Sequence, residues 1–461
     1  MGNRDLAVRY LNQGAETAKD LSKPTHGAHA YGLFCNSVMQ DPTFAYGWYN
    51  LGNANSDLKM IPAAVAAWRI ALNCEAEPDV RAKILCNLSW QVNWMGDPNE
   101  ALKFCRQSIE LDPKLANAWI NLSQISGILM DWPTAISAAR RAVALEPDNH
   151  ETEVALAFAL LHAGHFAEGL RHFERRFAWR LHHFLQYPFP KWNGETGKVI
   201  YIVADQGLGD TLSFSRFVPA VAEVSRFVHM SVQPELMNLF QYAFGHLQNV
   251  SIHPLAQQTM MQPADFWTTF VSLPYGLGFS DQKIIDTPAS PVPLERCPNL
   301  SWKSTDRKLH IGIQWAGSSS NEIDRHRSIP VAQFLELYRV SGIQLYSLQV
   351  DEKKKELHDA GCAALIRDLA PYVRNVSDTM AILQELDLVI CCESALAHMA
   401  GTIGKECWIP YSFYGRDYRI GYKGRAVLWY PTHRIFYQEI NQTWTQVFRE
   451  VVKALRKKVG E

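Results

Sequence analysis

A pattern of bulky and small residues recurs every 34 residues in the first third of the chain. Five positions of one copy have counterparts 34 residues later, pairing Leu85 with Trp119, Leu88 with Leu122, Ala101 with Ala135, Cys105 with Ala139 and Pro113 with Pro147. A unit of this length has an apolar face that only its neighbours can cover, so such units stack along one axis. The recurrence predicts a solenoid of paired helices with a concave surface.

The residue types at these positions are those of the tetratricopeptide repeat, as in Trp48-x2-Leu51-Gly52 followed by Ala64-x3-Trp68. An opening copy ends at Pro42, and a closing copy begins near His150 and keeps Leu156, Gly169 and Phe173. We therefore expect about five repeats over residues 1–178.

Asn50, Asn87 and Asn121 occupy the same place in successive repeats, directly before a leucine. Polar residues of the groove are the candidates for gripping the backbone of a bound peptide. An asparagine at this place can equally satisfy the backbone of the solenoid itself. The sequence leaves both interpretations open.

From Lys198 the pattern changes to short apolar runs separated by helical segments. The runs are 199–203, 227–232, 250–253, 265–273, 309–315, 343–348, 386–392 and 407–412. Continuous apolar strands joined by helices predict parallel sheets, and a proline-rich interruption near 287–306 separates two of them. We expect two Rossmann-like, doubly wound domains at 198–300 and 301–440, a linker at 179–197 before them, and a final helix at 441–461. Ligands of such sheets bind at the carboxyl ends of the strands, so the chemistry is expected in a cleft between the two domains.

Bulk properties exclude several classes of partner. The 461 residues carry a formal net charge of −1 without a long run of one sign, which gives no electrostatic case for nucleic acid or a membrane surface. The start, MGNRDLAVRY, lacks an apolar signal core, and no run of about eighteen uncharged apolar residues predicts a membrane span. Nine cysteines are scattered without a CxxC pair. We expect a cytoplasmic protein with reduced thiols.

The loop ADQGLGDTL, residues 204–212, lies between a buried strand and a helix. Gly207 and Gly209 allow a tight turn and close approach of a ligand. Leu212 stands where a dinucleotide fingerprint needs its third glycine, so nicotinamide binding is disfavoured. Asp210 is a candidate helix cap or, at the mouth of a cleft, a general base.

A second motif, CCESALAHMAG, follows a buried strand near the end of the chain. Ser394 and His398 are four residues apart and share a helix face near its N-terminus, where free amides favour an anion such as a diphosphate. The alternative is that Ser394 caps the helix and His398 packs. As a metal site the motif is poor, because Glu393 and His398 lack a third ligand at usable spacing.

Together, GLGDTLSFSRFVPAV and CESALAHMAG resemble glycosyltransferase family 9, which includes the ADP-heptose:lipopolysaccharide heptosyltransferases, in a subgroup fused to tetratricopeptide repeats. The resemblance covers roughly residues 195–440 and implies the GT-B fold. It implies that Asp210 is the catalytic base and that Glu393, Ser394 and His398 hold the phosphates and sugar of the donor. The basic residue that assists the leaving diphosphate maps to Arg325, with Arg327 as a rival.

Two features depart from the family. Glu393-Ser394 stands where the family usually has Asp-Thr, so the donor sugar is not assumed to be heptose. The repeat domain has no counterpart in the lipopolysaccharide enzymes, and the layout is more similar to that of protein O-GlcNAc transferases, whose catalytic motifs are not evident here.

Further candidates lie around the second predicted sheet. Strand ends place Gln314, Trp315, Leu348 and Gln349 where they can touch the base or ribose of a nucleotide. Asp378 is another nucleotide candidate, or a plain helix cap. The loop YGRDYRIGY carries Arg416, Asp417 and Arg419, which either close on the phosphates or lie in solvent. The final helix is amphipathic, and the resemblance implies that it crosses back onto the first Rossmann-like domain.

The leading interpretation is an inverting, metal-independent glycosyltransferase without a cofactor, which uses a nucleotide-sugar donor and docks a protein or peptide acceptor in its repeat groove. The second has the same chemistry with a lipid-linked or saccharide acceptor. The third is a repeat scaffold whose transferase domain is inactive. The sequence leaves a homo-oligomer possible and does not identify the sugar, the nucleotide or the acceptor.

Overall fold

The computed structural model describes residues 3–19, 25–178, 187–255, 262–289, 303, 309–318, 324–415, 417–420 and 427–460. Two segments of the sequence analysis fall largely outside these ranges, namely the first part of the predicted linker and the proline-rich bridge. The chain divides into two compact units, Met1–Ala163 and Gly164–Glu461. Each unit is described by itself.

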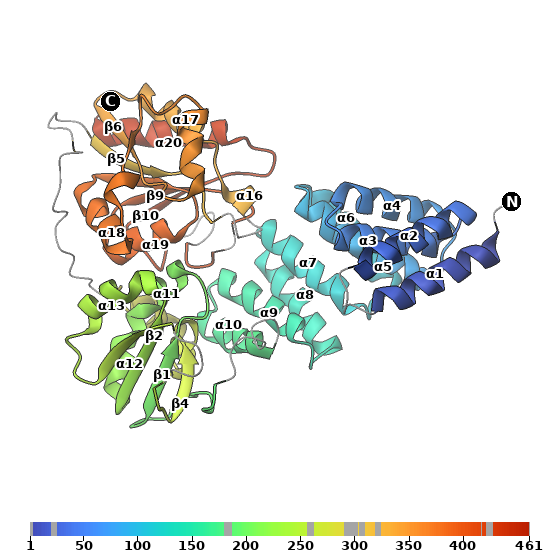
Figure 1. Ribbon diagram of the computed structural model, residues 1–461, viewed down its shortest axis with the longest axis horizontal. Coiled ribbons are helices and arrows are strands. Elements are labelled where there is room, and N and C mark those ends of the chain that lie inside the picture. The colour runs from blue at the N-terminus through green and yellow to red at the C-terminus, as the bar shows by residue number, and fades with distance from the viewer. Residues whose placement is uncertain are drawn as a thin grey trace. The chain divides into compact units, whose positions relative to one another are not determined.

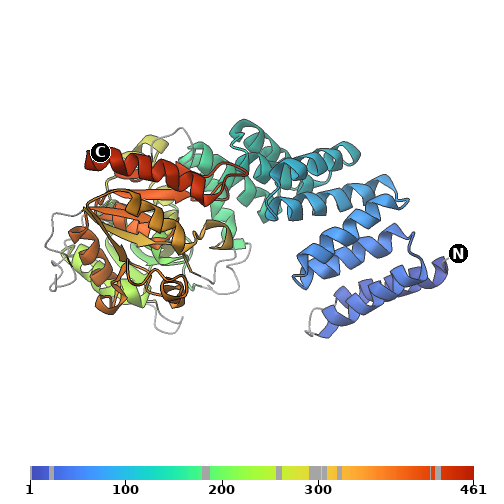
Figure 2. The same ribbon diagram turned by 90° about the horizontal axis from the view of Figure 1, so that it is seen from above.

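The first unit is built of helices that pack in consecutive pairs (Figures 1 and 2). They are α1 (Arg4–Lys19), α2 (Thr25–Gln40), α3 (Ala45–Asp57), α4 (Ile61–Asn73), α5 (Pro78–Trp94), α6 (Pro98–Leu111), α7 (Ala116–Ile128), α8 (Trp132–Leu145) and α9 (His150–Ala163). The repeat explains the packing, because a Cβ at Gly52 would lie only 2.3 Å from Nε1 of the buried Trp68. The small residue of the motif thus lets α3 and α4 cross closely, and the predicted tetratricopeptide-type solenoid is confirmed.

The recurrent asparagines bond mainly within the solenoid. Nδ2 of Asn87 donates to Oδ1 of Asn53 in the preceding repeat at 2.8 Å, and Nδ2 of Asn121 donates to the carbonyl of Cys86 at 3.0 Å. Asn50 donates to a carbonyl of its own helix. The second interpretation, in which the asparagines satisfy the backbone of the solenoid, accounts for Asn50 and Asn121, whereas Asn87 bonds to a side chain of the preceding repeat.

The second unit begins earlier than the sequence predicts. Helix α10 (Phe166–Phe173) and the 3-10 segment η1 (Glu174–Ala178) belong to it, because α10 packs on α14 (Leu273–Gly276) and α15 (Asp281–Asp286). The amide of Ala167 donates to Asp281 of α15. The predicted domain end at 178 is therefore wrong, and the compact unit starts at Gly164.

The first sheet of this unit is fully parallel, with the order β3-β2-β1-β4. Its strands are β1 (Val199–Val203), β2 (Phe227–Val232), β3 (Val250–Pro254) and β4 (Phe266–Thr269). Helices α11 (Leu208–Phe214), α12 (Val218–Val224) and α13 (Met237–Phe244) alternate with the strands. Strand β1 is an almost unbroken buried run, as expected for a strand covered on both faces.

Part of the predicted linker is packed structure. Lys191 forms a parallel bridge with Trp267 of β4, and the amide of Trp192 donates to the carbonyl of Trp267 at 2.8 Å. The indole of Trp192 is 1% exposed. The linker prediction is wrong for this stretch because its large aromatic residue completes the core of the first sheet.

The second sheet is also parallel, with the order β10-β9-β8-β5-β6-β7. Its strands are β5 (Leu309–Gln314), β6 (Ile343–Ser347), β7 (Arg367–Asp368), β8 (Leu388–Cys391), β9 (Cys407–Tyr411) and β10 (His433–Tyr437). Between them lie α16 (Asp324–Arg327), η7 (Val331–Arg339), α17 (Glu356–Asp359), α18 (Val376–Glu385) and α19 (Ala395–Thr402). The chain starts in the middle at β5, adds strands on one side and then returns to the other, so the order reverses between β5 and β8. Open α/β sheets bind ligands at such a reversal.

Helix α20 (Trp444–Val459) does not cross back onto the first sheet's domain as the resemblance implied. Its apolar face, with Val447, Phe448 and Val451, joins the core of the second sheet and packs on η7, β9 and β10 (Figure 2). A short connection from the edge strand β10 favours return to the strand's own sheet, where this apolar face finds partners. Among the described residues, no helix combines the length and the apolar character needed to cross a bilayer.

Candidate functional site

Helix α11 follows β1 of the first sheet, and helix α19 follows β8 of the second sheet. The two helices pack against each other within the second unit (Figure 1). The contact is tight at Gly209, where a Cβ would lie 2.6 Å from Cδ2 of His398. Position 209 therefore accommodates only glycine while the imidazole of His398 keeps its place. The two motifs that the sequence singled out are brought together at this point.

Asp210 acts as a helix-start residue and as a partner across the contact. Its Oδ2 accepts a hydrogen bond from the amide of Gly207 at 3.1 Å, so Asp210 helps to cap α11 from its third position, whereas the N-cap itself is Gly207 and not Asp210 as predicted. Its Oδ1 lies 2.8 Å from Nη2 of Arg419. The carboxylate is thus tied to the loop after β9.

We define the inter-sheet cluster as Asp210, His398, Asp417, Arg419 and Tyr430. Nε and Nη2 of Arg419 donate to the two oxygens of Asp417 at 2.8 and 2.9 Å, and both side chains are nearly buried. Burial works against the charge of Asp417, yet Arg419 and His398 hold its pKa well below the usual range. Among the described residues, Nη1 of Arg419 is buried without a hydrogen-bond partner.

His398 is fixed through both ring nitrogens. Nε2 lies 2.8 Å from Oδ2 of Asp417, and Nδ1 lies 3.1 Å from the hydroxyl of Tyr430. The ring is buried. The prediction that His398 holds donor phosphates stays a prediction, and the contacts show that a ligand would have to replace one of these partners.

Ser394 is the N-cap residue of α19, but its hydroxyl makes no cap hydrogen bond. It donates instead to Oε1 of Gln314, at the end of β5, at 2.6 Å. This pair spans the point where the strand order reverses. The first amides of a helix have no partner within the helix, so this place offers donors to an anion.

Glu393, directly before Ser394, is half-buried. Burial and the negative charge of Glu393 raise the pKa of Tyr411, at the end of β9. The acid therefore lies toward the carboxyl ends of the strands, as the motif predicts.

Three of the nucleotide candidates are buried instead of lining a surface. Trp315 belongs to the core of the second sheet, and Leu348 packs over Gly312 of β5. Oε1 of Gln349 accepts from the amides of Trp315 and Ala316 at 3.3 and 3.2 Å, which fixes the loop after β5. Their contact with a base or ribose stays a prediction, and in this structure the three side chains pack on or bond to the protein itself.

Asp378 takes part in the start of α18. The N-cap of this helix is Asn375, whose side chain accepts from the amide of Asp378 at 3.0 Å. Oδ2 of Asp378 accepts from the amide and Nε of Arg374. The helix-start alternative accounts for Asp378, although Asn375 is the cap itself.

The two rival arginines differ in position. Arg325 is exposed, and its Nε donates to His326. Arg327 is mostly buried, donates to Asp324 at 3.1 Å, and lies over Gly317 so closely that a Cβ there would be 2.3 Å from its Nη2. Arg327 is therefore the arginine that packs on the loop after β5.

The charge of Arg327 also reaches the end of β8. Burial raises the pKa of the Cys392 thiol well above its usual range, and Arg327 opposes that effect. Cys392 directly precedes Glu393 and Ser394. The geometry favours Arg327 over Arg325 as the cation next to the strand-order reversal.

The loop YGRDYRIGY is partly buried structure. Asp417 and Arg419 are each 8% exposed, so the solvent-loop interpretation is wrong for them. Arg416 lies outside the described residues. Two charges of opposite sign satisfy each other here, a pairing that spacing along the loop does not reveal.

Sequence analysis missed Arg216, which joins the end of α11 to the segment before β10 through Trp429. It follows α11 and donates to the carbonyls of Thr287 and Trp429 at 3.2 Å each. Its guanidinium also lies 4.9 Å from the Trp429 ring centroid. An arginine inside the apolar run SFSRFVPAV was the available signal, since a buried cation requires partners.

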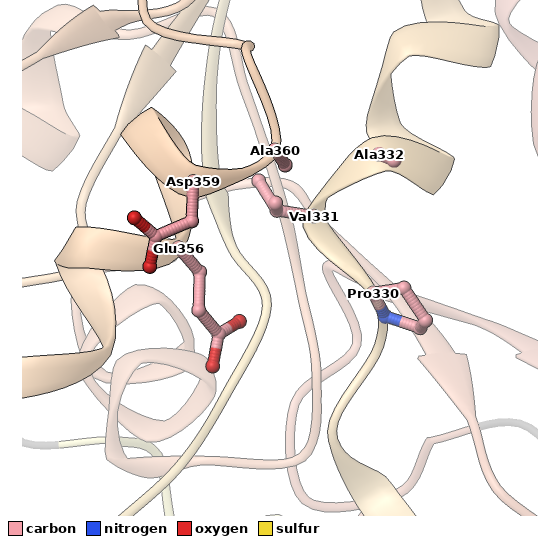
Figure 3. Close-up of a pocket in the computed structure, with 6 residues that line it drawn as sticks. All are labelled: Pro330, Val331, Ala332, Glu356, Asp359 and Ala360. Carbon is pink, nitrogen blue, oxygen red and sulfur yellow. The ribbon is translucent and has the colours of Figure 1, made fainter.

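Within the described residues, no group of three or more histidine, cysteine, aspartate or glutamate side chains is arranged to hold a metal ion. A surface hollow of about 300 Å³ is lined by residues of η7, α17 and their flanks (Figure 3). Glu356 and Asp359 are the acidic residues of its lining (Figure 3). None of its lining residues belongs to the inter-sheet cluster.

No protein-family model matches the sequence. Protein FlbA of Caulobacter vibrioides is 23% identical over 464 residues, covering 92% of this chain and 75% of FlbA. MamA from Desulfovibrio magneticus is 16% identical with a TM-score of 0.32, covering 38% of this chain and 94% of that structure. PilW, described as a widely conserved type IV pilus biogenesis factor, is 19% identical with a TM-score of 0.35, covering 40% of this chain and 81% of that structure. At these identities, activity has to be argued from the residues of this chain.

Proposed function

We propose that the second unit is a glycosyltransferase of the GT-B type, which moves a sugar from a nucleotide-sugar donor to a hydroxyl group with inversion and without a metal ion. The observation that carries the proposal is the contact between α11 and α19. Through it Gly209 packs against His398, and the neighbouring Asp210 pairs with Arg419, whose partner Asp417 also pairs with His398. Two parallel sheets whose strand ends supply both motifs suit a donor and an acceptor that meet between them.

The donor diphosphate belongs at the start of α19 in this proposal. The helix amides, the Ser394 hydroxyl and the cation of Arg327 are the groups that would hold its charge. Gln314 is the strand-end nucleotide candidate that keeps partial exposure. The Ser394–Gln314 hydrogen bond joins two neutral groups, so replacing it with phosphate contacts leaves no buried charge unpaired.

Asp210 takes the proton of the acceptor hydroxyl while the oxygen attacks the anomeric carbon. The bond from that carbon to the diphosphate breaks, and its electron pair leaves with the diphosphate. Arg419 and the Gly207 amide each engage one oxygen of the carboxylate, and a carboxylate has about four acceptor sites, so capacity remains for a proton. General base catalysis of this kind is worth about 10²- to 10⁴-fold in rate.

The acceptor in this proposal is a protein or peptide bound by the repeat domain, which presents a serine or threonine hydroxyl. Repeat solenoids offer extended concave surfaces of the kind that bind peptides. A lipid-linked or saccharide acceptor is compatible with the same chemistry.

A scaffold with an inactive second unit is the competing function. The observation in its favour is that Asp210, His398 and Asp417 are all paired within the protein. The same ion pairs would be present if these residues served only to hold the structure together. The two functions therefore need an assay that reports on a ligand.

The test is a donor panel. The full chain is incubated with UDP-, GDP-, ADP-, dTDP- and CMP-sugars, and thermal shift and slow donor hydrolysis are measured. We expect one nucleotide class to stabilise the chain, with hydrolysis that persists in excess EDTA. Asp210→Asn should abolish transfer and hydrolysis while leaving the nucleotide-induced shift unchanged. No response to any donor favours the scaffold, full activity of Asp210→Asn removes the base assignment, and a strict Mn²⁺ requirement contradicts the metal-free mechanism.

A further inference from the structure

Arg176 fills the place in the first sheet where a ligand would be expected. It belongs to η1, directly after α10, and its side chain is buried. Nη2 donates to Oγ1 of Thr269 at 2.8 Å, to Oγ of Ser272 at 2.9 Å and to Oδ2 of Asp205 at 3.1 Å. Nη1 donates to Glu174 at 2.9 Å. The guanidinium is therefore held by protein groups on several sides.

The position of these partners is informative. Asp205 follows β1 closely, and Thr269 is the last residue of β4. The strand order of the first sheet reverses between β1 and β4, so this is the crevice where an open α/β sheet binds ligands. Here the chain supplies its own cation to that crevice.

The charges around Arg176 are balanced by a second cation. Glu174 also pairs with Nζ of Lys191. Burial opposes the charge of Glu174, but Arg176 and Lys191 together lower its pKa. For Asp205, burial outweighs Arg176 and raises the pKa, and its Oδ1 is buried without a hydrogen-bond partner among the described residues. Asp205 therefore depends on Arg176 for its placement.

Asp205 lies in the short loop between β1 and α11, the helix whose third residue is Asp210. The loop is held at its start by the amide of Ala204, which donates to the carbonyl of Ser231 at 2.9 Å. Gln233 donates to the carbonyl of Gln206 at 2.8 Å. Arg176 adds an ion pair with Asp205, which lies in this loop between the end of β1 and the start of α11.

The segment around Arg176 also contacts the loop that holds Arg419, the ion-pair partner of Asp210. Phe166, at the start of α10, has its ring centroid 6.3 Å from that of Tyr418 and 5.9 Å from that of Trp429. Tyr418 directly precedes Arg419. The stretch Phe166–Ala178 thus contacts the loop of Asp210 through Arg176 and the loop of Arg419 through Phe166.

We infer that Arg176 is a positioning residue for Asp210: by holding Asp205 it fixes the loop that aims the Asp210 carboxylate at Arg419. The catalytic consequence rests on the proposed function, whereas the placement of the loop does not. The segment Phe166–Ala178, made of α10 and η1, is on this inference part of the framework that holds Asp210.

The first test needs no substrate. Hydrogen exchange of the amides of residues 205–211 is measured in the full chain for the wild type, Arg176→Gln and the matched control Arg175→Gln, whose arginine is the exposed neighbour in η1. We expect exchange in this loop to become roughly tenfold faster in Arg176→Gln and to stay at the wild-type rate in the control. Unchanged exchange in a folded Arg176→Gln overturns the inference.

Arg176→Gln leaves Asp205 and Glu174 short of a partner, so it can fail to fold. The double variant Arg176→Met with Asp205→Asn removes the charges of that pair together and keeps a side chain of similar length. We expect it to fold and to show the same fast exchange at residues 205–211. Protection equal to the wild type in this double variant also overturns the inference.

The second test uses the donor that the panel identifies. We expect kcat to fall roughly 10- to 100-fold in Arg176→Gln while nucleotide affinity stays unchanged, because misplacing a reacting group affects the chemical step. Arg176→Lys should recover part of kcat, and Arg175→Gln should retain all of it. An altered loop with an unchanged kcat refutes positioning. Absence of transfer in the wild type counts against the proposed function, and the exchange result then still decides the placement of the loop.

Discussion

Replacing Gly209 with alanine is the sharpest test of the contact between α11 and α19. The new Cβ would lie 2.6 Å from Cδ2 of His398 and 3.4 Å from Cα of Ala395. The shorter contact has to lengthen to an ordinary van der Waals distance of at least 3.4 Å. Either the helices separate or the imidazole moves.

Moving the imidazole has its own cost, because both ring nitrogens are engaged by Asp417 and Tyr430. Inserting a methyl group into a packed interior typically costs about 1–3 kcal/mol. A lost hydrogen bond to a charged group costs about 1.5–3 kcal/mol, which is similar. We therefore expect Gly209→Ala to lower the free energy of unfolding of the second unit by about 1–3 kcal/mol.

Gly207→Ala is the matched control in the same loop. Its Cβ would meet Oδ2 of Asp210 at 3.3 Å, at a φ of −67° that alanine adopts readily. Because Gly207 is the N-cap of α11, where alanine is less favourable than glycine, we expect a smaller loss than for Gly209→Ala, of about 0.5–1 kcal/mol. Differential scanning calorimetry and urea denaturation of the full chain measure both variants.

A double-mutant cycle then locates the clash. In a His398→Ala background the ring is gone, so Gly209→Ala should cost much less, with an interaction energy of about 0.5–3 kcal/mol. An equal loss in both backgrounds, or a Gly209→Ala protein as stable as the wild type, would refute the packing of α11 on α19.

Two further predictions concern the second sheet. Burial lowers the pKa of His433 to about 4, and its Nε2 donates to the carbonyl of Ala397, so the folded state keeps this ring neutral while the unfolded chain binds a proton below pH of about 6.5. The free energy of unfolding therefore decreases as pH falls from about 6.5 to about 4. Between pH 7 and 5 urea denaturation should show that this histidine lowers it by about 2 kcal/mol. The decrease should be smaller in His433→Gln and unchanged in the control His358→Gln, whose histidine is exposed. Phe448→Ala should destabilise by about 3–5 kcal/mol in the same assay, because this buried ring packs at 5.0 Å on Phe334 of η7. The exposed neighbour Arg449→Ala should change stability by less than about 0.5 kcal/mol, and equal effects of the two would show that α20 is not seated on η7.

The elements with strong local signals were predictable from the sequence. The 34-residue recurrence identified the solenoid, and the apolar runs identified the long strands of both sheets. Strands β7 and β10 were missed because they are sheet edges with mixed composition, RD and HRIFY. The placement of α20 was missed because amphipathicity shows that a helix has an apolar face but not which core receives it.

The candidate site was predictable in part for a similar reason. Glycines and a serine directly after predicted strands identify the two motifs in the sequence. The structure brings the motifs together at Gly209 and His398. The side chains that hold them, Arg176, Arg216 and Arg419, act across long sequence separations. The burial of Trp315 and Leu348 was not predicted, because a strand end looks the same in sequence whether it lines a cleft or closes a core.

The two points of strand-order reversal in the second unit are built differently, and the difference decides which sheet suits a donor. At the first, Arg176 is held by buried carboxylates and hydroxyls, and displacing it would leave Asp205 without its cation and Glu174 with Lys191 alone. At the second, one hydroxyl-to-amide hydrogen bond between Ser394 and Gln314 spans the strand ends beside the amides of α19. A diphosphate can exchange with a neutral pair far more cheaply than with a buried cation, because no charge is stranded. Under the proposed function, the second sheet is therefore the better site for the donor, and the first contributes Asp210 from α11, beside a crevice that Arg176 already fills.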